Sequence, residues 1–310
     1  MGTFQLTTPV VFIIFNRPAT TERVFSAIRA AKPPELLIIA DGPRSRESGE
    51  SEKCAAARAV VEKVDWDCKV LKNYAAVNFG CGKRLASGLD WVFSQVAEAI
   101  ILEDDCLPHP SFFPYCQELL ARYRDDERVM TISGNNFQFG RRRTADSYYF
   151  SRYAHIWGWA TWRRVWRYYD YGMKLWPRFR DERRLTDIFA GLGTVDGQLQ
   201  AIAGREAVRY WHYAFEHTYT GKIDTWDIQL IFACWQQNGL NILPNVNLVT
   251  NIGFDDQATH TRQPGSKFAN LPVAAMKFPL CHPPFMVGDV WADTYTQINN
   301  YGWPEGTSLD

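Results

Sequence analysis

The sequence predicts an α/β protein with a doubly wound, mostly parallel sheet and flanking helices. Over the first 140 residues, short apolar runs alternate with segments whose apolar residues recur at helical spacing. The runs are apolar throughout, as in parallel strands that are covered on both faces, and such alternation is typical of β-α-β units. We expect residues 1–140 to form this α/β half. Residues 141–310 are expected to complete one continuous domain and to end in a wrapping tail.

Five strands with four intervening helices are expected in the first half. Thr20 is the expected N-cap of the first helix, and Pro33-Pro34 ends it. The other helices cover 54–64, 85–96 and a segment that begins near Ser111. The expected strands are Val10–Phe15, Leu36–Ala40, Lys69–Leu71, Ala99–Leu102 and Val129–Ile132.

The second half is rich in aromatic residues. The chain has 12 Trp, 14 Tyr and 19 Phe, and many of them gather in the stretch YYFSRYAHIWGWATWRRVWRYYDYGMKLWP. Trp side chains stack on flat partners such as sugar faces, and the alternative is a well-packed core. Further on, a helix is expected over Asp227–Gln237 and a short strand over Asn241–Leu243.

Charge and cysteine content narrow the function classes. The 34 basic and 34 acidic residues cancel, which argues against a nucleic-acid binder that works by bulk positive charge. The seven cysteines are scattered and form no C-x-x-C pair, so a reducing compartment fits best. No stretch approaches the roughly 20 apolar residues of a membrane span. We therefore expect a cytoplasmic protein, and peripheral contact with the inner face of the membrane stays open.

Known nucleotide-binding signatures are missing. No G-x-G-x-x-G follows the first strand and no P-loop motif occurs. The turn Gly80-Cys81-Gly82-Lys83 precedes a helix, and such a turn can hold phosphate through backbone N–H groups and Lys83. A plain turn is the alternative reading of this segment.

Polar side chains follow the expected strands. In a doubly wound sheet, ligands bind outside the carboxyl ends of the strands. This geometry brings four clusters to one edge, namely Asn16-Arg17, Asp41, Glu103-Asp104-Asp105 and Asn135-Asn136.

The three consecutive carboxylates carry the sharpest chemical signal. Glu103, Asp104 and Asp105 would repel one another at the end of a buried strand unless a cation joins them. Carboxylate oxygens completed by water and phosphate suit Mg²⁺ or Mn²⁺. A metal held there could bridge a nucleoside diphosphate and stabilise it as a leaving group. A solvated acidic turn is the alternative.

These segments resemble those of the GT-A-type glycosyltransferases. The strand that ends in Glu-Asp-Asp is followed by CLPHPSFFPYCQELL and VMTISGNN, and the chain opens with FIIFNRP and ELLIIADGP. Later segments are WGWATWRRVW, LWP, TWD, ILPNVNLVTNIGF and ATHT. The chain is most similar to the N-acetylglucosaminyltransferases that start N-glycan branching and to their bacterial relatives. The likeness covers about residues 8–265.

The resemblance implies a GT-A fold, with the first half binding a nucleotide sugar and the second half facing the acceptor. It also implies a role for particular residues on the donor side. Asp105 would ligate Mn²⁺ or Mg²⁺, Asp104 would contact the ribose or the metal shell, and Glu103 the donor sugar. Four further residues would contact the nucleotide or its diphosphate: Arg17, Asp41 near the base, Lys83 and His260.

On the acceptor side, Asp227 would be the general base. The family has two acids after its Trp, whereas Trp226 here is followed by Asp227 alone, so Asp224, three residues earlier, is the alternative. Trp157 and Trp159 could form a platform for an acceptor sugar, unless they pack in the core. These roles predict a metal-dependent, inverting transfer from a nucleoside-diphosphate sugar, with a UDP-sugar favoured. The acceptor would be a glycan or glycolipid, as in bacterial surface-polysaccharide synthesis.

Three other functions compete with this hypothesis. A glycoside hydrolase could use Glu103 and Asp227 as its carboxylate pair. A carbohydrate-binding protein would explain the Trp content but not the acidic strand end. A nucleotidyltransferase that makes sugar nucleotides has a similar sheet, but it usually has a Gly-rich loop where this chain has FNRPAT.

Overall fold

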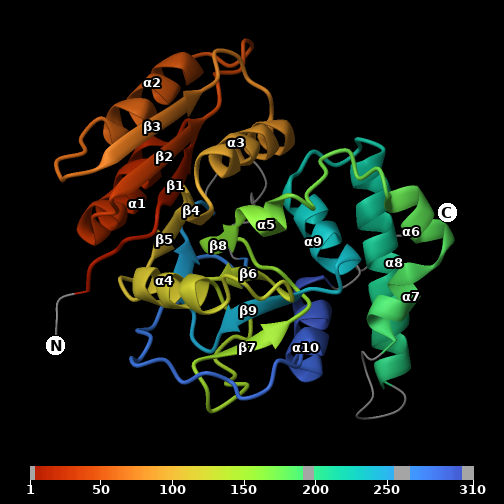
Figure 1. The fold of residues 1–310 in the computed structure, drawn as a ribbon. Coiled ribbons are helices and arrows are strands. Elements are labelled where there is room, and N and C mark those ends of the chain that lie inside the picture. Colours follow the sequence, from red (N-terminus) through yellow and green to blue (C-terminus); the bar gives the residue numbers. More distant parts are fainter. Residues whose placement is uncertain (1–3, 191–198, 255–265, 302–310) are drawn as a thin grey trace.

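The computed structural model describes residues 4–190, 199–254 and 266–301 (Figure 1). Ten strands are present: β1 Val10–Ile14, β2 Glu35–Ala40, β3 Lys69–Tyr74, β4 Glu98–Glu103, β5 Cys106–Pro108, β6 Val129–Ser133, β7 Tyr148–Ser151, β8 Trp159–Trp162, β9 Leu240–Pro244 and β10 Val249–Asn251. Eight of them form one sheet in the order β3-β2-β1-β4-β8-β6-β9-β7, while β5 and β10 pair separately. Only β8 and β7 run against the other six strands of the large sheet. The prediction of a mostly parallel α/β sheet is confirmed.

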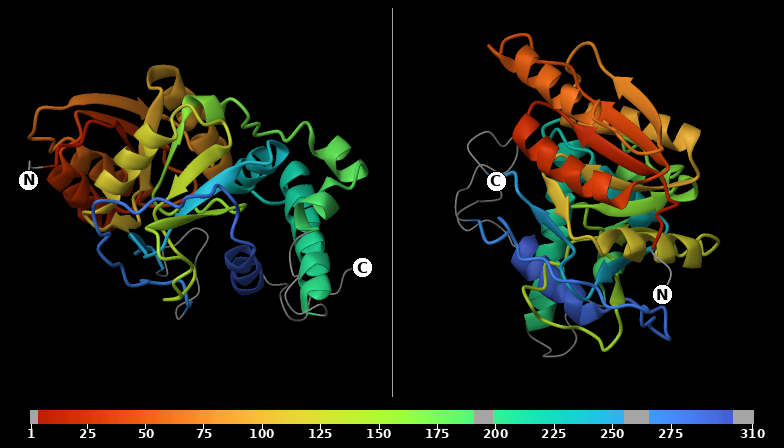
Figure 2. Two further views of the ribbon diagram at one scale, coloured as in Figure 1. Left: turned by 60° about the horizontal axis from the view of Figure 1, so that its bottom comes forward. Right: turned by 90° about the vertical axis from the view of Figure 1, so that its left-hand side faces the viewer.

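Helices cover the sheet and extend one end of the molecule (Figures 1 and 2). They are α1 Pro18–Ala31, α2 Glu50–Val61, α3 Cys81–Gln95, α4 Phe112–Arg122, α5 Arg163–Trp166, α6 Trp176–Asp181, α7 Arg184–Phe189, α8 Leu199–Tyr219, α9 Asp227–Gln236 and α10 Val290–Asn300. Helices α6 to α9 pack together beside the sheet. In the part of the chain that the structure describes, no helix combines the length and the apolar character needed to cross a membrane.

The strand order places a switch point between β1 and β4. The chain runs outward from β1 through β2 to β3, then returns to pair β4 with the other side of β1. Because βαβ crossovers are right-handed, α1 and α2 belong on one face of the sheet and α3 on the other. The carboxyl ends of β1 and β4 therefore border a crevice, which is the usual place for a ligand in such a sheet.

Helix α1 begins two residues earlier than its expected N-cap. Thr20 and Thr21 donate their hydroxyl protons to the carbonyl oxygen of Arg17, at 3.1 and 2.7 Å. Pro18 is the first helical residue, where its missing N–H costs nothing and its fixed φ suits the helix. The prediction of Thr20 as the N-cap is wrong for this reason.

The largest difference from the expected sheet is strand β8, which lies between β4 and β6. All four of its residues are buried, and it pairs with both neighbours in antiparallel fashion. The aromatic stretch therefore contributes a strand to the core that its sequence pattern did not predict. Strands β7 and β9 join the same sheet, so strands from both sides of residue 140 share it. All seven cysteines are free thiols.

Candidate active site

A cavity of about 660 Å³ lies at the carboxyl ends of β1, β2 and β4. The loop after β1, the first turn of α3, the loop before β8 and the start of α9 complete its walls. Its lining includes the predicted site residues Arg17, Asp41, Glu103, Asp104, Asp105, Trp157, Asp224 and Asp227. The chain thus brings most of the predicted residues into one cavity at the switch point of the sheet.

Two of the three consecutive carboxylates are tied to the end of β1. The backbone N–H of Phe15 donates to Asp104 Oδ2 at 3.1 Å. Arg17 Nη2 lies 3.3 Å from Asp104 Oδ1 and 3.0 Å from Asp105 Oδ2. These contacts hold the acidic strand end against β1. Glu103 lies beside the carboxylates of Asp104 and Asp105.

The electrostatics of this trio are unfavourable without a further cation. Burial and the neighbouring carboxylates of Asp105 and Asp104 raise the pKa of Glu103 well above its ordinary value, and Asp227 adds to the effect. Burial also raises the pKa of Asp104 to about 6, although Arg17 opposes the rise. A single guanidinium therefore does not neutralise the trio, and a second positive charge would fit beside it.

The loop after β10 closes over the acidic trio. Arg17 Nη1 donates to the carbonyl oxygen of Gly253 at 3.5 Å. A Cβ atom at Gly253 would lie 2.4 Å from Arg17 Nη1 and 2.5 Å from Asp105 Oδ2. A larger residue at this position would therefore have to displace the side chains of Arg17 and Asp105.

Asp41 shapes the wall of the cavity through backbone contacts. Its carboxylate accepts N–H bonds from Gly42 at 2.8 Å, Phe79 at 3.0 Å and Gly80 at 3.2 Å. Burial raises the pKa of Asp41, and these N–H donors oppose the rise. Its carboxylate fixes the turn that precedes α3 and lines the cavity at the same time.

The predicted contact of Lys83 is replaced by its neighbour. Lys83 is exposed, stands over the ring of Phe79 at 5.5 Å and does not line the cavity. Arg84 lines it instead, with Nε donating to the Ala40 carbonyl at 3.1 Å. Successive residues on a helix face different directions. Arg84 lies four residues before the buried Gly88 and therefore on the same face of α3, and this spacing was the signal that could have identified it.

The two candidate bases differ in what holds them. Asp224 Oδ1 accepts the N–H of Gly82 at 3.1 Å, and Cβ atoms at Gly80 and Gly82 would lie 2.9 and 2.5 Å from its carboxylate oxygens. Asp224 therefore caps the start of α3 and takes the place that the turn offers to a phosphate. Asp227, the first residue of α9, accepts a hydrogen bond from the Thr225 hydroxyl. Its carboxylate lines the cavity, and among the described residues it accepts no hydrogen bond from a backbone N–H.

The aromatic residues divide between the cavity and the core. The Trp157 ring lines the cavity and meets Phe137 at 4.9 Å and Phe254 at 5.7 Å between centroids. Trp159 is 1 % exposed and stacks on Trp226 at 5.6 Å, so it packs in the core and cannot face an acceptor. That part of the predicted platform is wrong.

Two features of the site concern histidines and metal ligands. His260 lies outside the described residues. His155 is buried next to Phe137, its ring nitrogens have no hydrogen-bond partner in the described part, and burial lowers its pKa to about 4.

Among the residues that the structure describes, no group of three His, Cys, Asp or Glu side chains is arranged as a metal site.

Comparisons with known proteins complete this description. No family model and no curated protein matches the chain. Similar solved structures include HddC from Yersinia pseudotuberculosis (8% identity, TM-score 0.34) and a UDP-glucose pyrophosphorylase complexed with UDP-glucose (10%, 0.32). A third is the inositol-1-phosphate CTP transferase from T. maritima (8%, 0.30). The alignments cover 56%, 53% and 52% of this chain and 87%, 79% and 74% of the others. At these scores the likeness carries no argument about activity.

Proposed function

We propose that the protein is a metal-dependent, inverting glycosyltransferase. It would move a sugar from a nucleoside-diphosphate donor, a UDP-sugar being favoured, to a hydroxyl group of a glycan or glycolipid. One observation carries the proposal: a single cavity holds the Glu103-Asp104-Asp105 strand end and Asp227 at the start of α9. Asp227 is close enough to help raise the pKa of Glu103. Leaving-group stabilisation on the donor and proton removal from the acceptor can therefore act together on two substrates bound in one cavity.

The charge of the cavity supports a cation between protein and donor. Among the described residues, six carboxylates and three guanidinium groups line it; these are Asp41, Glu103, Asp104, Asp105, Asp224 and Asp227, with Arg17, Arg44 and Arg84. Arg44 is already paired with Glu50 at 2.5 Å. A diphosphate would meet net repulsion in this cavity unless a divalent cation accompanied it.

The residues present fit Mg²⁺ or Mn²⁺ held together with the donor. Mg²⁺ is usually bound by one or two carboxylates plus substrate phosphates rather than by a full protein cage, which agrees with the lack of a three-ligand group in the described chain. Asp105 is the side chain that would hold it, with Asp104 beside it and Glu103 toward the donor sugar. When bound, the ion would offset the negative charge of the leaving diphosphate.

The remaining roles follow from position. Asp227 would take the proton of the acceptor hydroxyl on the side opposite the leaving group, which gives inversion. Such a base contributes about 10²–10⁴-fold. The Trp157 ring would cover one face of the acceptor sugar. Arg17 would contact the diphosphate, and His260 remains a prediction for the same ligand.

The setting of the reaction belongs to the same proposal. Seven free thiols support a reducing, cytoplasmic compartment. A glycan or lipid-linked acceptor of surface-polysaccharide synthesis would then be used at the inner face of the membrane.

The test is a transfer assay with purified protein. UDP-sugars and other nucleoside-diphosphate sugars are offered with glycan acceptors in Mn²⁺, in Mg²⁺ and in EDTA, and free nucleoside diphosphate is measured. We expect release that requires both a divalent ion and an acceptor. Release that is equal in EDTA would contradict metal dependence, and no release with any donor would overturn the transferase proposal.

One observation favours a second candidate, a glycoside hydrolase. The raised pKa of Glu103 is what a general acid needs, and Asp227 shares its cavity in a different environment. This enzyme would cleave aryl glycosides in EDTA without any nucleotide. Loss of that cleavage in Glu103→Gln, with no nucleotide binding in wild type, would establish the hydrolase instead.

A further inference from the structure

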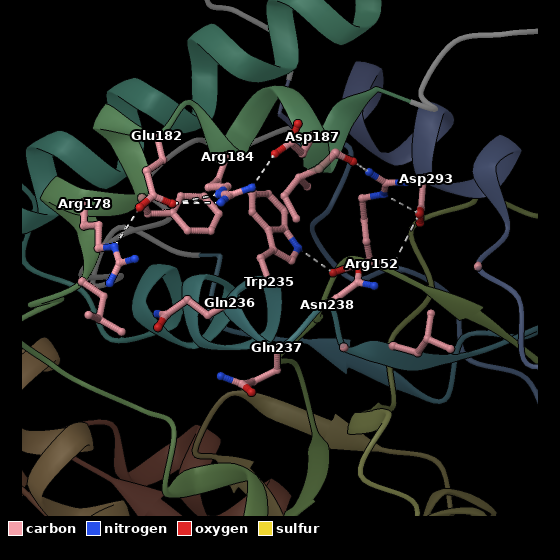
Figure 3. A pocket seen from close by; sticks show the side chains of 16 residues that line it. Arg152, Arg178, Glu182, Arg184, Asp187, Trp235, Gln236, Gln237, Asn238 and Asp293 are labelled. Carbon is pink, nitrogen blue, oxygen red and sulfur yellow. Dashed lines mark hydrogen bonds and ion pairs between the residues drawn. The ribbon is translucent and has the colours of Figure 1, made fainter.

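A second cavity, of about 780 Å³, lies where β9 begins and β7 ends, at the opposite end of the strands from the first (Figure 3). No described residue lines both cavities. Helix α9 connects them, because Asp227 in its first turn lines the first and Gln236 at its end lines the second. At about 1.5 Å per residue the helix separates them by roughly 15 Å.

The charges of the second cavity are matched within the protein. Three guanidiniums and three carboxylates line it: Arg152, Arg178, Arg184, Glu182, Asp187 and Asp293. Arg184 pairs with Glu182 at 3.0 Å and with Asp187 at 3.2 Å, and Arg178 pairs with Glu182 at 2.8 Å. Arg152 Nε lies 3.0 Å from Asp293 Oδ2, as Figure 3 shows. An anion or a cation would gain no net attraction here, so the cavity suits a neutral ligand.

Three consecutive amides line the same cavity. Gln236, Gln237 and Asn238 stand at the C-terminal end of α9. None of their side chains has a hydrogen-bond partner among the described residues. Each carboxamide offers two donors and an acceptor with two lone pairs. Carboxamides at this position can serve a ligand whose groups both donate and accept, as hydroxyl groups do.

An apolar wall on the α6–α7 side also lines the cavity. It consists of Leu175, Phe179 and Ile188. Leu175 is 56 % exposed, and the Phe179 ring is braced by Phe232 at 5.2 Å between centroids. Ligand pockets combine apolar surface with a few polar groups that fix orientation. The apolar C–H face of a sugar ring needs such a wall, and its hydroxyl edge needs the amides.

We propose that this second cavity is a non-catalytic binding site for a neutral oligosaccharide. A peptide that adds to the sheet edge fits less well, because edge strand β7 is already bridged at Phe150 by Gly288, and the Asp289 N–H donates to the Phe150 carbonyl at 2.7 Å. The inference goes beyond the catalytic proposal and does not depend on it. If both hold, glycan retained here would raise the effective acceptor concentration at the first cavity.

Titration calorimetry and saturation-transfer NMR test this site. Wild-type protein is offered short linear neutral oligosaccharides of the glucan, mannan, galactan and N-acetylglucosamine series, in EDTA and without nucleotide. We expect at least one series to bind. Gln237→Ala and Leu175→Ser should each weaken that binding about tenfold, or about 1.4 kcal/mol. Gln95→Ala is the matched control, since Gln95 is an exposed amide at the end of α3.

Three outcomes would overturn the site. The first is that no neutral oligosaccharide binds, and the second is that only an anionic oligosaccharide or a peptide binds. The third is binding that survives both variants but is lost in Trp157→Ala, which would place the sugar in the first cavity. Metal-dependent nucleotide binding is measured separately on the same wild-type protein, so a failure of the catalytic proposal is told apart from a failure of this one.

Discussion

The two cavities of this protein are similar in size, but the first is lined by an excess of acidic groups whereas the second is balanced in charge. In the first, six carboxylates face three guanidiniums at the carboxyl ends of parallel strands, and burial shifts the pKa values of Glu103 and Asp104 upward. In the second, three carboxylates form ion pairs with three guanidiniums. A cavity with excess negative charge therefore favours a ligand that brings a cation, whereas a cavity with balanced charges suits a neutral molecule.

The largest expected effect concerns the base in the first cavity. Asp227→Asn should lower transfer by about 10²–10⁴-fold and leave donor binding unchanged, because only proton removal is lost. Asp187→Asn, the matched change in the second cavity, should leave transfer unchanged. Initial rates and nucleotide titrations check both. Near-normal transfer by Asp227→Asn would remove this residue from the mechanism.

A second prediction tests the matched charges. Arg152→Ala leaves Asp293, which is 1 % exposed, without its cation. We expect the free energy of unfolding to fall by about 3 kcal/mol, since breaking one side of a buried pair strands the other. Urea denaturation measures the change, with the exposed Arg178→Ala as control. A loss no larger than the control's would show that the second cavity does not need its ion pair.

A third prediction concerns the buried histidine in the loop before β8. His155 has its pKa lowered by burial to about 4, whereas an ordinary histidine titrates near 6.5. As the pH falls, this histidine is therefore protonated in the unfolded chain before it is protonated in the folded one. The free energy of unfolding falls by about 3 kcal/mol between pH 6.5 and 4. His155→Phe should flatten that part of the stability profile in urea unfolding, while the exposed His212→Asn should not. An equally steep profile in His155→Phe would contradict the buried, neutral ring.

The smallest expected effect separates the acceptor surfaces of the two cavities. Trp157→Ala should raise the acceptor KM about fivefold through lost stacking worth about 1 kcal/mol, and leave nucleotide affinity unchanged. It should also leave oligosaccharide binding at the second cavity intact. Steady-state kinetics and calorimetry on one preparation measure all three quantities. A fall in nucleotide affinity alone would move Trp157 to the donor side.

Much of the first cavity could be predicted from sequence because parallel strands bring their carboxyl ends to one edge. The expected strands around 10–15, 36–40 and 99–102 each occur, and the polar residues that follow them meet in the cavity. What failed depended on long-range packing. β8 is a strand because it pairs with β4 and β6, and no local pattern of four residues specifies that pairing.

The errors within the site have the same origin. Asp224 caps α3 because two segments 142 residues apart in sequence come together. Lys83 turns outward while Arg84 turns inward, which only the packing of α3 decides. The second cavity was not predicted, because its lining comes from four separate segments, at the end of β7, around α6 and α7, at the end of α9 and around the start of α10, and contains no motif.

The central claim is that the acidic strand end binds a nucleoside diphosphate through a divalent cation. Titration calorimetry of nucleoside diphosphates in Mn²⁺ and in EDTA tests it most directly, with wild type, Asp105→Ala and the exposed control Asp67→Asn. We expect binding in Mn²⁺ that EDTA abolishes and that Asp105→Ala weakens roughly a hundredfold or more, because such an ion contributes several kcal/mol. Equal affinity in EDTA, or an Asp105→Ala protein that binds like wild type, would contradict the account.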